Sequence, residues 1–281
     1  MTISRNLLLN WTLVTGLACL KTNAADSVTN SPTSNPVPLT RAHAHNDYEH
    51  RRPLLDALDC GFCSVEADIF LVDGQLLVAH SRSGLNPERT LDRMYLEPLV
   101  QRVKDNHGSV YPRSAPFTLL IDIKENGNGI YSLLKEKLHH FAPTWTHFSG
   151  TNVTPGAITV VLSGDRPTEL VKADTDRDCA LDGPIEALEQ NWPPTLAPLV
   201  SDSWGPTFSW RGNGSFPSDQ QGRLTRLVQQ AHAQGRRLRF WAVPDRPEVW
   251  GVLHRSGVDL VNTDRLPQLR DFLLKLNSDG R

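Results

Sequence analysis

Two acidic residues spaced two apart are the first feature of this sequence that could do chemistry. Glu66 and Asp68 lie in the run Ser-Val-Glu-Ala-Asp-Ile-Phe, whose composition favours a β-strand. Side chains two residues apart on a strand point to the same face. Two carboxylates in an apolar interior repel each other unless a cation lies between them, and hard divalent ions prefer oxygen ligands. We therefore predict that both residues bind a divalent metal ion.

A third carboxylate completes the predicted metal site. Asp122 ends another β-rich run, Leu-Leu-Ile-Asp-Ile-Lys, and the oxygen-only set that results predicts Mg²⁺ or Ca²⁺. Lys124 shares the face of Asp122, and its ammonium group is suited to a phosphate oxygen. A structural network of salt bridges is the alternative, because an Asp-x-Lys pair alone is common.

Histidines end two further β-rich runs. His43 and His45 belong to Arg-Ala-His-Ala-His-Asn-Asp-Tyr, and His80 ends Leu-Val-Ala-His. General acid and base catalysis near neutral pH needs such groups, and packing alone does not explain them beside three carboxylates. We predict His80 and one of the first two as the catalytic pair. His43 is preferred because it directly follows the strand, although His45 has the same parity.

Eight short β-rich runs, separated by helix-compatible stretches, must position these side chains. They are Leu39–His43, Ser64–Phe70, Leu76–His80, Phe117–Ile123, Ile158–Ser163, Ala197–Ser201, Arg239–Val243 and Val258–Asn262. Such alternation predicts an α/β protein with a (β/α)8 TIM barrel, whose sites lie at the carboxyl ends of the strands. Only residues 71–75 separate the second and third runs. Because no crossover helix fits there, we expect an irregular barrel.

Later strand ends supply second-tier candidates for substrate binding: Arg166, Asp202, Trp241 and Asp264. Trp241 is equally compatible with a place in the core. The segment from Gly205 to Gly222 is rich in glycine, proline and aromatic residues and predicts a long loop. Such a loop either roofs the site or covers ordinary surface.

The composition narrows the class of partner. The chain has 281 residues, 39% of them hydrophobic, which is enough for one domain with a large core. Its 29 basic and 31 acidic residues nearly balance and form no run of like charge. Nothing therefore indicates nucleic acid or an anionic membrane surface as a partner, and we expect a small substrate. The oligomeric state stays open.

The amino-terminal segment differs from the rest. A positive residue, an apolar stretch over residues 7–20 and small residues after it are typical of a secretory signal peptide at residues 1–25. Residues 26–38 have the composition of a flexible linker, and the folded domain is expected at residues 39–281. The apolar stretch is too short for a membrane span, so we predict export, with lipid attachment at Cys19 as a minor alternative.

Three cysteines follow this segment, Cys60, Cys63 and Cys179. A link between the first two, or from either to the third, is one interpretation, and buried free thiols are the other. The Cys-x-x-Cys pair has no second pair, which argues against a zinc site.

Together these motifs resemble the phospholipase C-like phosphodiesterases, which include the glycerophosphodiester phosphodiesterases and spider-venom sphingomyelinase D. The family's sequence of motifs is matched by His43 or His45, Glu66-Ala-Asp68, Asp73-Gly74, His80, Asp122-Ile-Lys124, Phe240-Trp241 and Gly257 to Asp264. The arrangement His43-x-x-Asn46 is similar to sphingomyelinase D, which adds Asn46 to the substrate-binding candidates.

The sequence more closely resembles the branch named after altered inheritance of mitochondria protein 6. This resemblance covers about residues 39–275 and rests on His43 to Tyr48, Ser64 to Asp68, Ser163 to Pro167 and Arg239 to Asp245. The His-Arg-Gly and Pro-Glu-Asn-Thr signatures of glycerophosphodiesterases do not follow the first histidine. Glycerophosphodiester specificity therefore stays open.

The resemblance implies a metal-dependent phosphoric diester hydrolase that acts on a glycerophosphodiester-like or phospholipid-like substrate. A neighbouring substrate hydroxyl, or water, would attack phosphorus. One histidine would take its proton and the other would protonate the leaving oxygen. The metal ion and Lys124 would neutralise charge on the phosphoryl oxygens.

Three alternatives stay open. A lyase of the sphingomyelinase D kind would form a cyclic phosphate, and loop aromatics would either give it a lipid-facing rim or pack locally: Trp204, Phe208, Trp210 and Phe216. A metal-dependent barrel enzyme acting on sugars would not need Lys124. A non-catalytic binding protein would have no physical reason to keep three uncompensated inward carboxylates.

Overall fold

Eight parallel strands close into a barrel in the computed structural model, which describes residues 35–190 and 192–279. Around the barrel they are β1 (Leu39–Ala44), β2 (Phe62–Val72), β4 (Phe117–Ile123), β7 (Ile158–Gly164), β9 (Ala180–Gly183), β10 (Leu199–Ser203), β11 (Arg237–Trp241) and β12 (Leu260–Thr263). Strand β1 pairs with both β12 and β2, which closes the sheet. The predicted TIM barrel is confirmed.

One predicted strand lies outside the barrel. The run from Leu76 forms β3 (Gln75–Val78), which pairs antiparallel with the end of β2. Asp73 and Gly74 both have positive φ, as a two-residue hairpin turn requires. The short connection thus forms a hairpin. The barrel reaches eight strands through β9, which was not predicted, is only four residues long and follows several charged residues.

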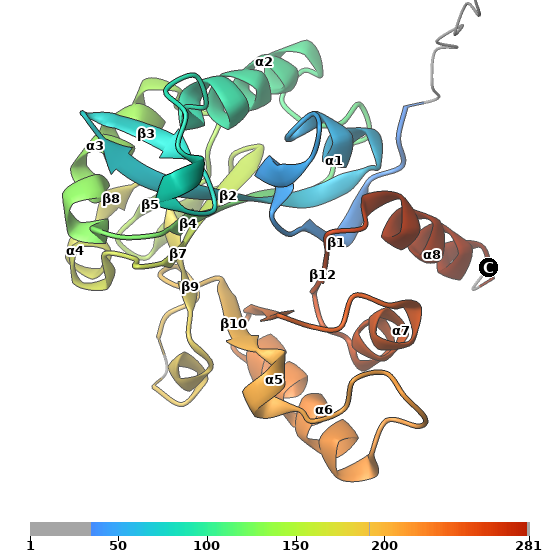
Figure 1. The fold of residues 1–281 in the computed structure, drawn as a ribbon. Coiled ribbons are helices and arrows are strands. Elements are labelled where there is room, and N and C mark those ends of the chain that lie inside the picture. Colours follow the sequence, from blue (N-terminus) through green and yellow to red (C-terminus); the bar gives the residue numbers. More distant parts are fainter. Residues whose placement is uncertain (1–34, 191, 280–281) are drawn as a thin grey trace, which may run out of the picture. The chain divides into compact units, whose positions relative to one another are not determined.

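Helices lie around the outside of the barrel, as Figure 1 shows. The α-helices are α1 (Leu55–Asp59), α2 (Glu97–Asp105), α3 (Gly127–His140), α4 (Thr168–Ala173), α5 (Trp204–Thr207), α6 (Ser218–Ala233), α7 (Pro247–Ser256) and α8 (Leu266–Asp279). Short 3-10 or π turns are η1 (Asp47–Glu49), η2 (Arg82–Gly84), η3 (Asp92–Leu96) and η4 (Ile185–Leu188). A small antiparallel sheet contains β5 (His147–Ser149), β6 (Asn152–Thr154) and β8 (Asp176–Arg177).

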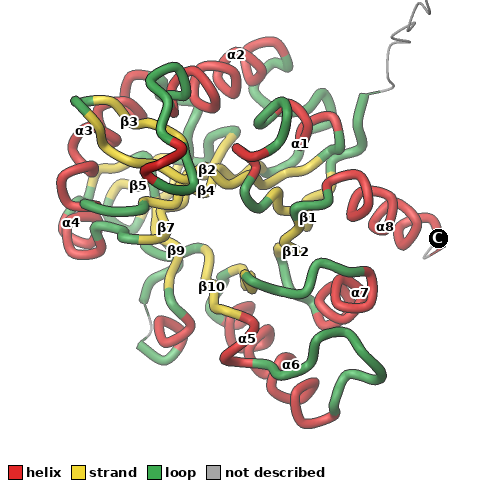
Figure 2. Tube along the Cα trace, in the orientation of Figure 1, coloured by secondary structure: helices red, strands yellow, loops and turns green. Residues whose placement is uncertain are grey.

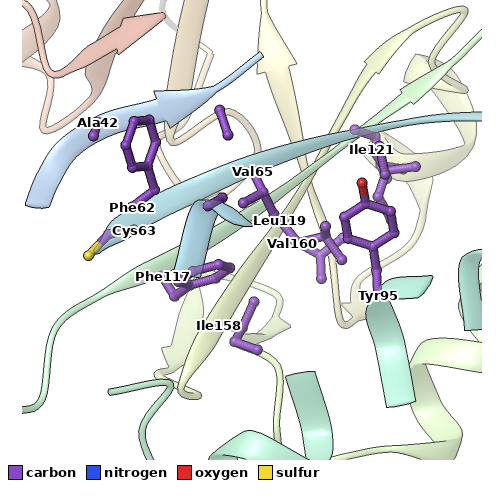
Figure 3. Packing of buried hydrophobic residues seen from close by; sticks show 14 of the residues in the cluster. Ala42, Phe62, Cys63, Val65, Tyr95, Phe117, Leu119, Ile121, Ile158 and Val160 are labelled. Atoms are coloured by element: carbon purple, nitrogen blue, oxygen red, sulfur yellow. The ribbon is translucent and has the colours of Figure 1, made fainter. Parts of the chain in front are cut away.

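Strand alternation divides the side chains between two cores. Val65, Leu119 and Val160 are neighbours in register on β2, β4 and β7 and pack in the large core under the helices (Figure 3). Residues of the opposite parity form a separate small cluster, which places them inside the barrel: Leu120, Val161, Leu199 and Leu260. Two residues beyond Leu120 and Val161 on the same face come Asp122 and Ser163, so polar side chains fill the carboxyl end of the barrel.

The predicted long loop is shorter than expected. Helix α5 begins at Trp204 and α6 at Ser218, so residues 208–217 form the connection between them (Figure 2). Its aromatic rings pack on one another: the ring centroids of Trp204 and Phe208 are 4.3 Å apart, and those of Trp210 and Phe216 are 5.0 Å apart. These residues therefore pack locally instead of forming a lipid-facing rim.

The cysteines of the described residues are free and buried. Burial raises the pKa of Cys63 and of Cys179 to about 12. Because the thiolate is the reactive form, we expect no reaction of a Cys19→Ser variant with Ellman's reagent at pH 8 until denaturant is added. Three thiols should then react. One fast-reacting thiol in the native protein would contradict this burial.

Residues 1–34 lie outside the described residues, and with them the predicted signal peptide and most of the predicted linker. Strand β1 begins at Leu39. Within the described ranges, no helix has the length and apolar character to cross a membrane.

Candidate active site

A cavity of about 310 Å³ lies at the carboxyl end of the barrel strands. Six predicted site residues line it: His45, Glu66, Asp122, Lys124, Arg166 and Trp241. Six further residues complete its wall: Ser163, Gly164, Asp182, Gly183, Ser201 and Arg239. A larger cavity of about 740 Å³ lies near Pro116 and Ala157, which precede β4 and β7, and therefore at the opposite end of these strands.

Glu66 is buried in this wall beside a positive charge. Its Oε2 accepts hydrogen bonds from Arg239 at 2.8 Å and from the ring of His43 at 3.0 Å. Burial alone would raise the pKa of Glu66, but the charge of Arg239 and the bond from His43 together lower it to about 2. Glu66 is therefore an ionised carboxylate paired with an internal guanidinium.

Asp68 and Asp122 share one ammonium group. Lys124 Nζ lies 2.6 Å from Asp68 Oδ2 and 2.9 Å from Asp122 Oδ1, and the Ser163 hydroxyl donates to Asp122 Oδ2 at 2.9 Å. Burial raises the pKa of Asp68 to about 6 despite Lys124. The carboxylates are thus compensated, and the assumption that they lack a countercharge is wrong. The compensating cations are Lys124, which directly follows β4, and Arg239 on β11.

The predicted metal ligands Glu66, Asp68 and Asp122 lie close together at the carboxyl end of the barrel. They occupy neighbouring strands, with Asp68 in register with Asp122, and all their donor atoms are oxygens. Asp68 Oδ1 is buried and has no hydrogen-bond partner within the described residues, as a reserved ligand atom would be. Among the described residues, however, no three His, Cys, Asp or Glu side chains are arranged so that together they could hold a metal ion. The donors fit a hard divalent ion chemically, and Lys124 bridges two of them.

His43 and His45 differ in burial and in the direction of their pKa shifts. His43 is fully buried, and its ring nitrogens bond to Ser64 Oγ at 2.7 Å and to Glu66 at 3.0 Å. Burial lowers its pKa to about 4. His45 lines the cavity, and its Nδ1 bonds to Asp264 Oδ1 at 2.8 Å. Burial acts to lower the pKa of His45, but Asp264 and Glu66 outweigh it and raise the pKa. The geometry therefore favours His45 over the preferred His43.

His80 lies beside the cavity, not in its wall. Its Nδ1 is 3.0 Å from the Tyr48 hydroxyl and 3.4 Å from Asp68 Oδ2, and its side chain is 66% exposed. The Tyr48 hydroxyl also contacts Asp68 Oδ2 and Asn46 Oδ1, while Asn46 Nδ2 lies 3.0 Å from His45 Nδ1. A continuous chain of contacts therefore joins the two histidines through Asn46 and Tyr48.

Asp202 corrects one substrate-binding prediction. Its carboxylate accepts hydrogen bonds from Ser203 N at 2.7 Å and from Thr207 Oγ1 at 2.6 Å, and it does not line the cavity. Strand alternation instead turns the preceding residue, Ser201, into the cavity wall. Asp202 stabilises the start of α5 and is not part of the candidate site.

Among the residues of the site to which the sequence assigned no role are Tyr48, Asp182 and Arg239. Arg239 had a usable signal, because it has the parity of Trp241 on one predicted strand. Tyr48 stands in the same motif as His45 and Asn46. Asp182 had no signal once its short strand was missed.

Asp47, in the same motif as His45 and Tyr48, joins two neighbouring segments of the chain by hydrogen bonds. It is buried, and its Oδ2 accepts hydrogen bonds from Leu54 N at 2.6 Å and Tyr95 Oη at 2.7 Å. Burial raises its pKa to about 7. The folded state therefore holds this proton more tightly than the unfolded chain, whose Asp pKa is about 3.9. Stability from this group is present below about pH 4 and is lost as pH rises to about 7.

We expect the melting temperature to fall between pH 5 and pH 8, and the fall to be smaller in Asp47→Asn. The amide oxygen of the variant can still accept both bonds but carries no titrating proton. The effect on unfolding free energy should be on the order of a few kcal/mol across this range. Equal pH dependence in both proteins would show that Asp47 does not titrate as its burial indicates.

The barrel resembles solved phosphodiesterase structures. A calcium-dependent phosphoinositol-specific phospholipase C from Pseudomonas sp. superposes with a TM-score of 0.56 at 13% identity, over 84% of this chain and 93% of that one. A glycerophosphodiester phosphodiesterase from Parabacteroides distasonis gives 0.54 at 15% identity, over 86% and 99%. At this identity the similarity shows the shared fold, that of a phospholipase C-like barrel.

Residues 32–182 match the model of the AIM6-like phosphodiesterase domain. Altered inheritance of mitochondria protein 6 from Eremothecium gossypii is 31% identical over 83% of this chain and 69% of that protein. A homolog from Arthroderma benhamiae is 29% identical over 82% and 81%. The chain therefore belongs to the AIM6-like phosphodiesterase family, and the predicted phosphodiesterase class is confirmed.

These relatives contradict one prediction. They are fungal proteins named for altered inheritance of mitochondria, which disagrees with export through a signal peptide or lipid attachment at Cys19. The prediction of export is therefore wrong. Its basis was an apolar segment with basic residues and no acidic residue before Asp26, and several kinds of targeting segment share such a composition.

Proposed function

We propose that this protein cleaves a glycerophosphodiester-like or phospholipid-like substrate, with His45 as the general base. One observation carries the proposal: His45 shares a single cavity with Lys124, Arg166 and Arg239. Ammonium and guanidinium groups suit phosphoryl oxygens, and a histidine suits proton transfer near neutral pH. The similarity to a glycerophosphodiester phosphodiesterase and a phosphoinositol-specific phospholipase C supports this substrate class.

The contacts of His45 explain its proposed role. Its Nδ1 bonds to Asp264, so Nε2 is the nitrogen that can take a proton from the attacking hydroxyl. Asp264 also stabilises the imidazolium that results. If the attacking hydroxyl belongs to the substrate, the product is a cyclic phosphate. If it belongs to water, the product is a phosphomonoester.

His80 is the proposed general acid for the leaving oxygen. Its Nδ1 is 3.0 Å from the Tyr48 hydroxyl, so Nε2 is the ring nitrogen left to donate to the leaving oxygen. Tyr48 in turn contacts buried Asp68, which orients the hydroxyl. Lys124 and Arg239 would neutralise charge as it develops on the phosphoryl oxygens, because both cations already stand in or beside the cavity wall.

A divalent ion, Mg²⁺ or Ca²⁺, is part of the proposal. Glu66, Asp68 and Asp122 would hold it, and when bound it would neutralise phosphoryl charge. The oxygen-only donors and the unpartnered Asp68 Oδ1 support this assignment, as does the calcium dependence in the name of one structural neighbour. Lys124 competes with such an ion for Asp68 and Asp122.

The test is hydrolysis of bis(p-nitrophenyl) phosphate, glycerophosphodiesters and lysophospholipids by the full chain, with and without EDTA. We expect turnover that EDTA lowers at least tenfold and that Mg²⁺ or Ca²⁺ restores. Phosphorus NMR of the product separates a cyclic phosphate from a monoester. Full turnover in EDTA would contradict the metal ion alone. No turnover on any substrate would contradict the proposed function and favour a sugar enzyme or a binding protein.

A further inference from the structure

The cavity wall formed by β9 carries a carboxyl group that the proposed chemistry does not use. Asp182 lines the cavity, although only 4% of its surface is exposed. Its Oδ1 is buried and accepts no hydrogen bond from the described residues. Buried polar atoms in proteins are almost always hydrogen-bonded, because an unpaired one is costly. A buried acceptor in a cavity wall therefore indicates a ligand group that bonds to it.

Arg239 does not satisfy this oxygen. Its Nη1 lies 3.5 Å from the other oxygen, Asp182 Oδ2, while its Nη2 donates to Glu66 at 2.8 Å and its Nε donates to Asn262 at 3.0 Å. These bonds hold the guanidinium in place between two carboxylates. Ser201, whose hydroxyl lines the same cavity and is also without a hydrogen-bond partner among the described residues, is close enough to lower the pKa of Asp182. The Asp182 carboxyl is thus fixed next to a cation, and it shares with Ser201 a part of the wall whose polar atoms are left for a ligand.

The charges around the cavity select the ligand's chemistry. A quaternary ammonium headgroup has no N–H and cannot donate a hydrogen bond to Asp182 Oδ1. A primary ammonium would have to compete with Arg239 at the same carboxyl. The cavity wall matches Glu66, Asp122 and Asp182 with Lys124, Arg166 and Arg239, so no excess of negative charge attracts a cation. A hydroxyl group is neutral, and it can donate to Asp182 while it accepts from Arg239.

The ionisation of Asp182 is compatible with this partner. Burial raises its pKa to about 6, although Arg239 acts to lower it. Near neutral pH the carboxyl group can therefore exist in both forms. A hydroxyl bonds to either one, as a donor to the carboxylate or as an acceptor from the protonated acid.

We propose that Asp182 is a specificity-determining residue that binds a hydroxyl group of a neutral polyol, carried as the alcohol part of the phosphodiester. This inference rests on the proposed function, since it names the alcohol of the same substrate. The cavity is at the lower end of the size range of ligand sites, which suits a headgroup and not a whole lipid. Glycerol and inositol-type rings are the polyols that fit this chemistry.

The experiment compares kcat/KM for glycerophosphoinositol and glycerophosphoglycerol with that for ethyl phosphocholine, a choline diester whose two alcohols carry no free hydroxyl. We expect the wild type to prefer the polyol substrates and Asp182→Ala to reduce that preference at least tenfold, because the substrate hydroxyl loses its partner. Asp182→Asn keeps an amide that can donate and accept, and should lose less. Asp219→Ala, an exposed change on α6, is the matched control.

The outcomes separate this inference from the proposed function. Equal losses on polyol and choline substrates in Asp182→Ala, or a wild-type preference for choline, would overturn the role of Asp182. If the wild type fails even with bis(p-nitrophenyl) phosphate, the proposed function fails. Calorimetric binding of glycerophosphoinositol to wild type and Asp182→Asn then decides the inference: weaker binding by the variant supports it, and equal binding or no binding to the wild type overturns it.

Discussion

Replacement of His45 by alanine is expected to lower kcat for bis(p-nitrophenyl) phosphate by about 10²–10⁴-fold. His45 lines the cavity and bonds through Nδ1 to Asp264, as a general base held in one orientation does. It is only partly buried, so the variant should fold. The measurement is steady-state turnover of the variant, with its melting temperature recorded beside it.

Two further variants serve as comparisons: His43→Ala changes the buried neighbour, and His140→Ala is the exposed control. His43 is fully buried and bonds to Ser64 and Glu66, so its loss should lower the melting temperature together with activity. His140 is exposed at the end of α3, and its loss should change neither. If His43→Ala were stable but inactive while His45→Ala kept its turnover, the roles of the two histidines would be reversed.

Strand periodicity explains why part of the site was predictable. On long strands the period of two determines which side chains face inward, so the motif around Glu66 and the Asp122-x-Lys124 pair identified residues that do line one cavity. Parity does not determine depth along the barrel axis. His43 and His45 share a face, yet His43 lies in register with Ser64 and is enclosed, while His45 reaches the cavity.

Long-range pairing explains why other parts of the site could not be predicted from the sequence. Glu66 and Arg239 are 173 residues apart, and only barrel closure brings their side chains together. The sequence motifs therefore showed Glu66 without its cation, and they showed Lys124 beside Asp122 but not its contact with Asp68. Strand β9 was missed because Ala180 and Leu181 are its only apolar residues and several charged residues precede it, and Asp182 was missed with it.

Replacement of Arg239 by methionine is expected to destabilise the protein by about 3–5 kcal/mol, because it leaves buried carboxylates without their cation. Glu66 would keep only its contact with His43, and Asp182 would lose its only ion-pair partner within the described residues. Urea denaturation measures the change. Arg93→Met is the matched control, since Arg93 pairs with Glu88 on the surface and should contribute less than about 1 kcal/mol.

A double variant tests whether the loss comes from the buried charge and not from packing. Glu66→Gln removes the carboxylate that Arg239 compensates, so Arg239→Met combined with Glu66→Gln should be more stable than the sum of the two single losses predicts. Arg239→Lys keeps a charge but cannot bond to Glu66 and Asn262 with the same fork, and should fall between wild type and Arg239→Met. Strict additivity, or a loss below 1 kcal/mol in Arg239→Met, would mean that Arg239 does not compensate Glu66. Activity should fall in every Arg239 variant, because the same guanidinium that stabilises the barrel also lines the cavity where the phosphodiester is proposed to bind.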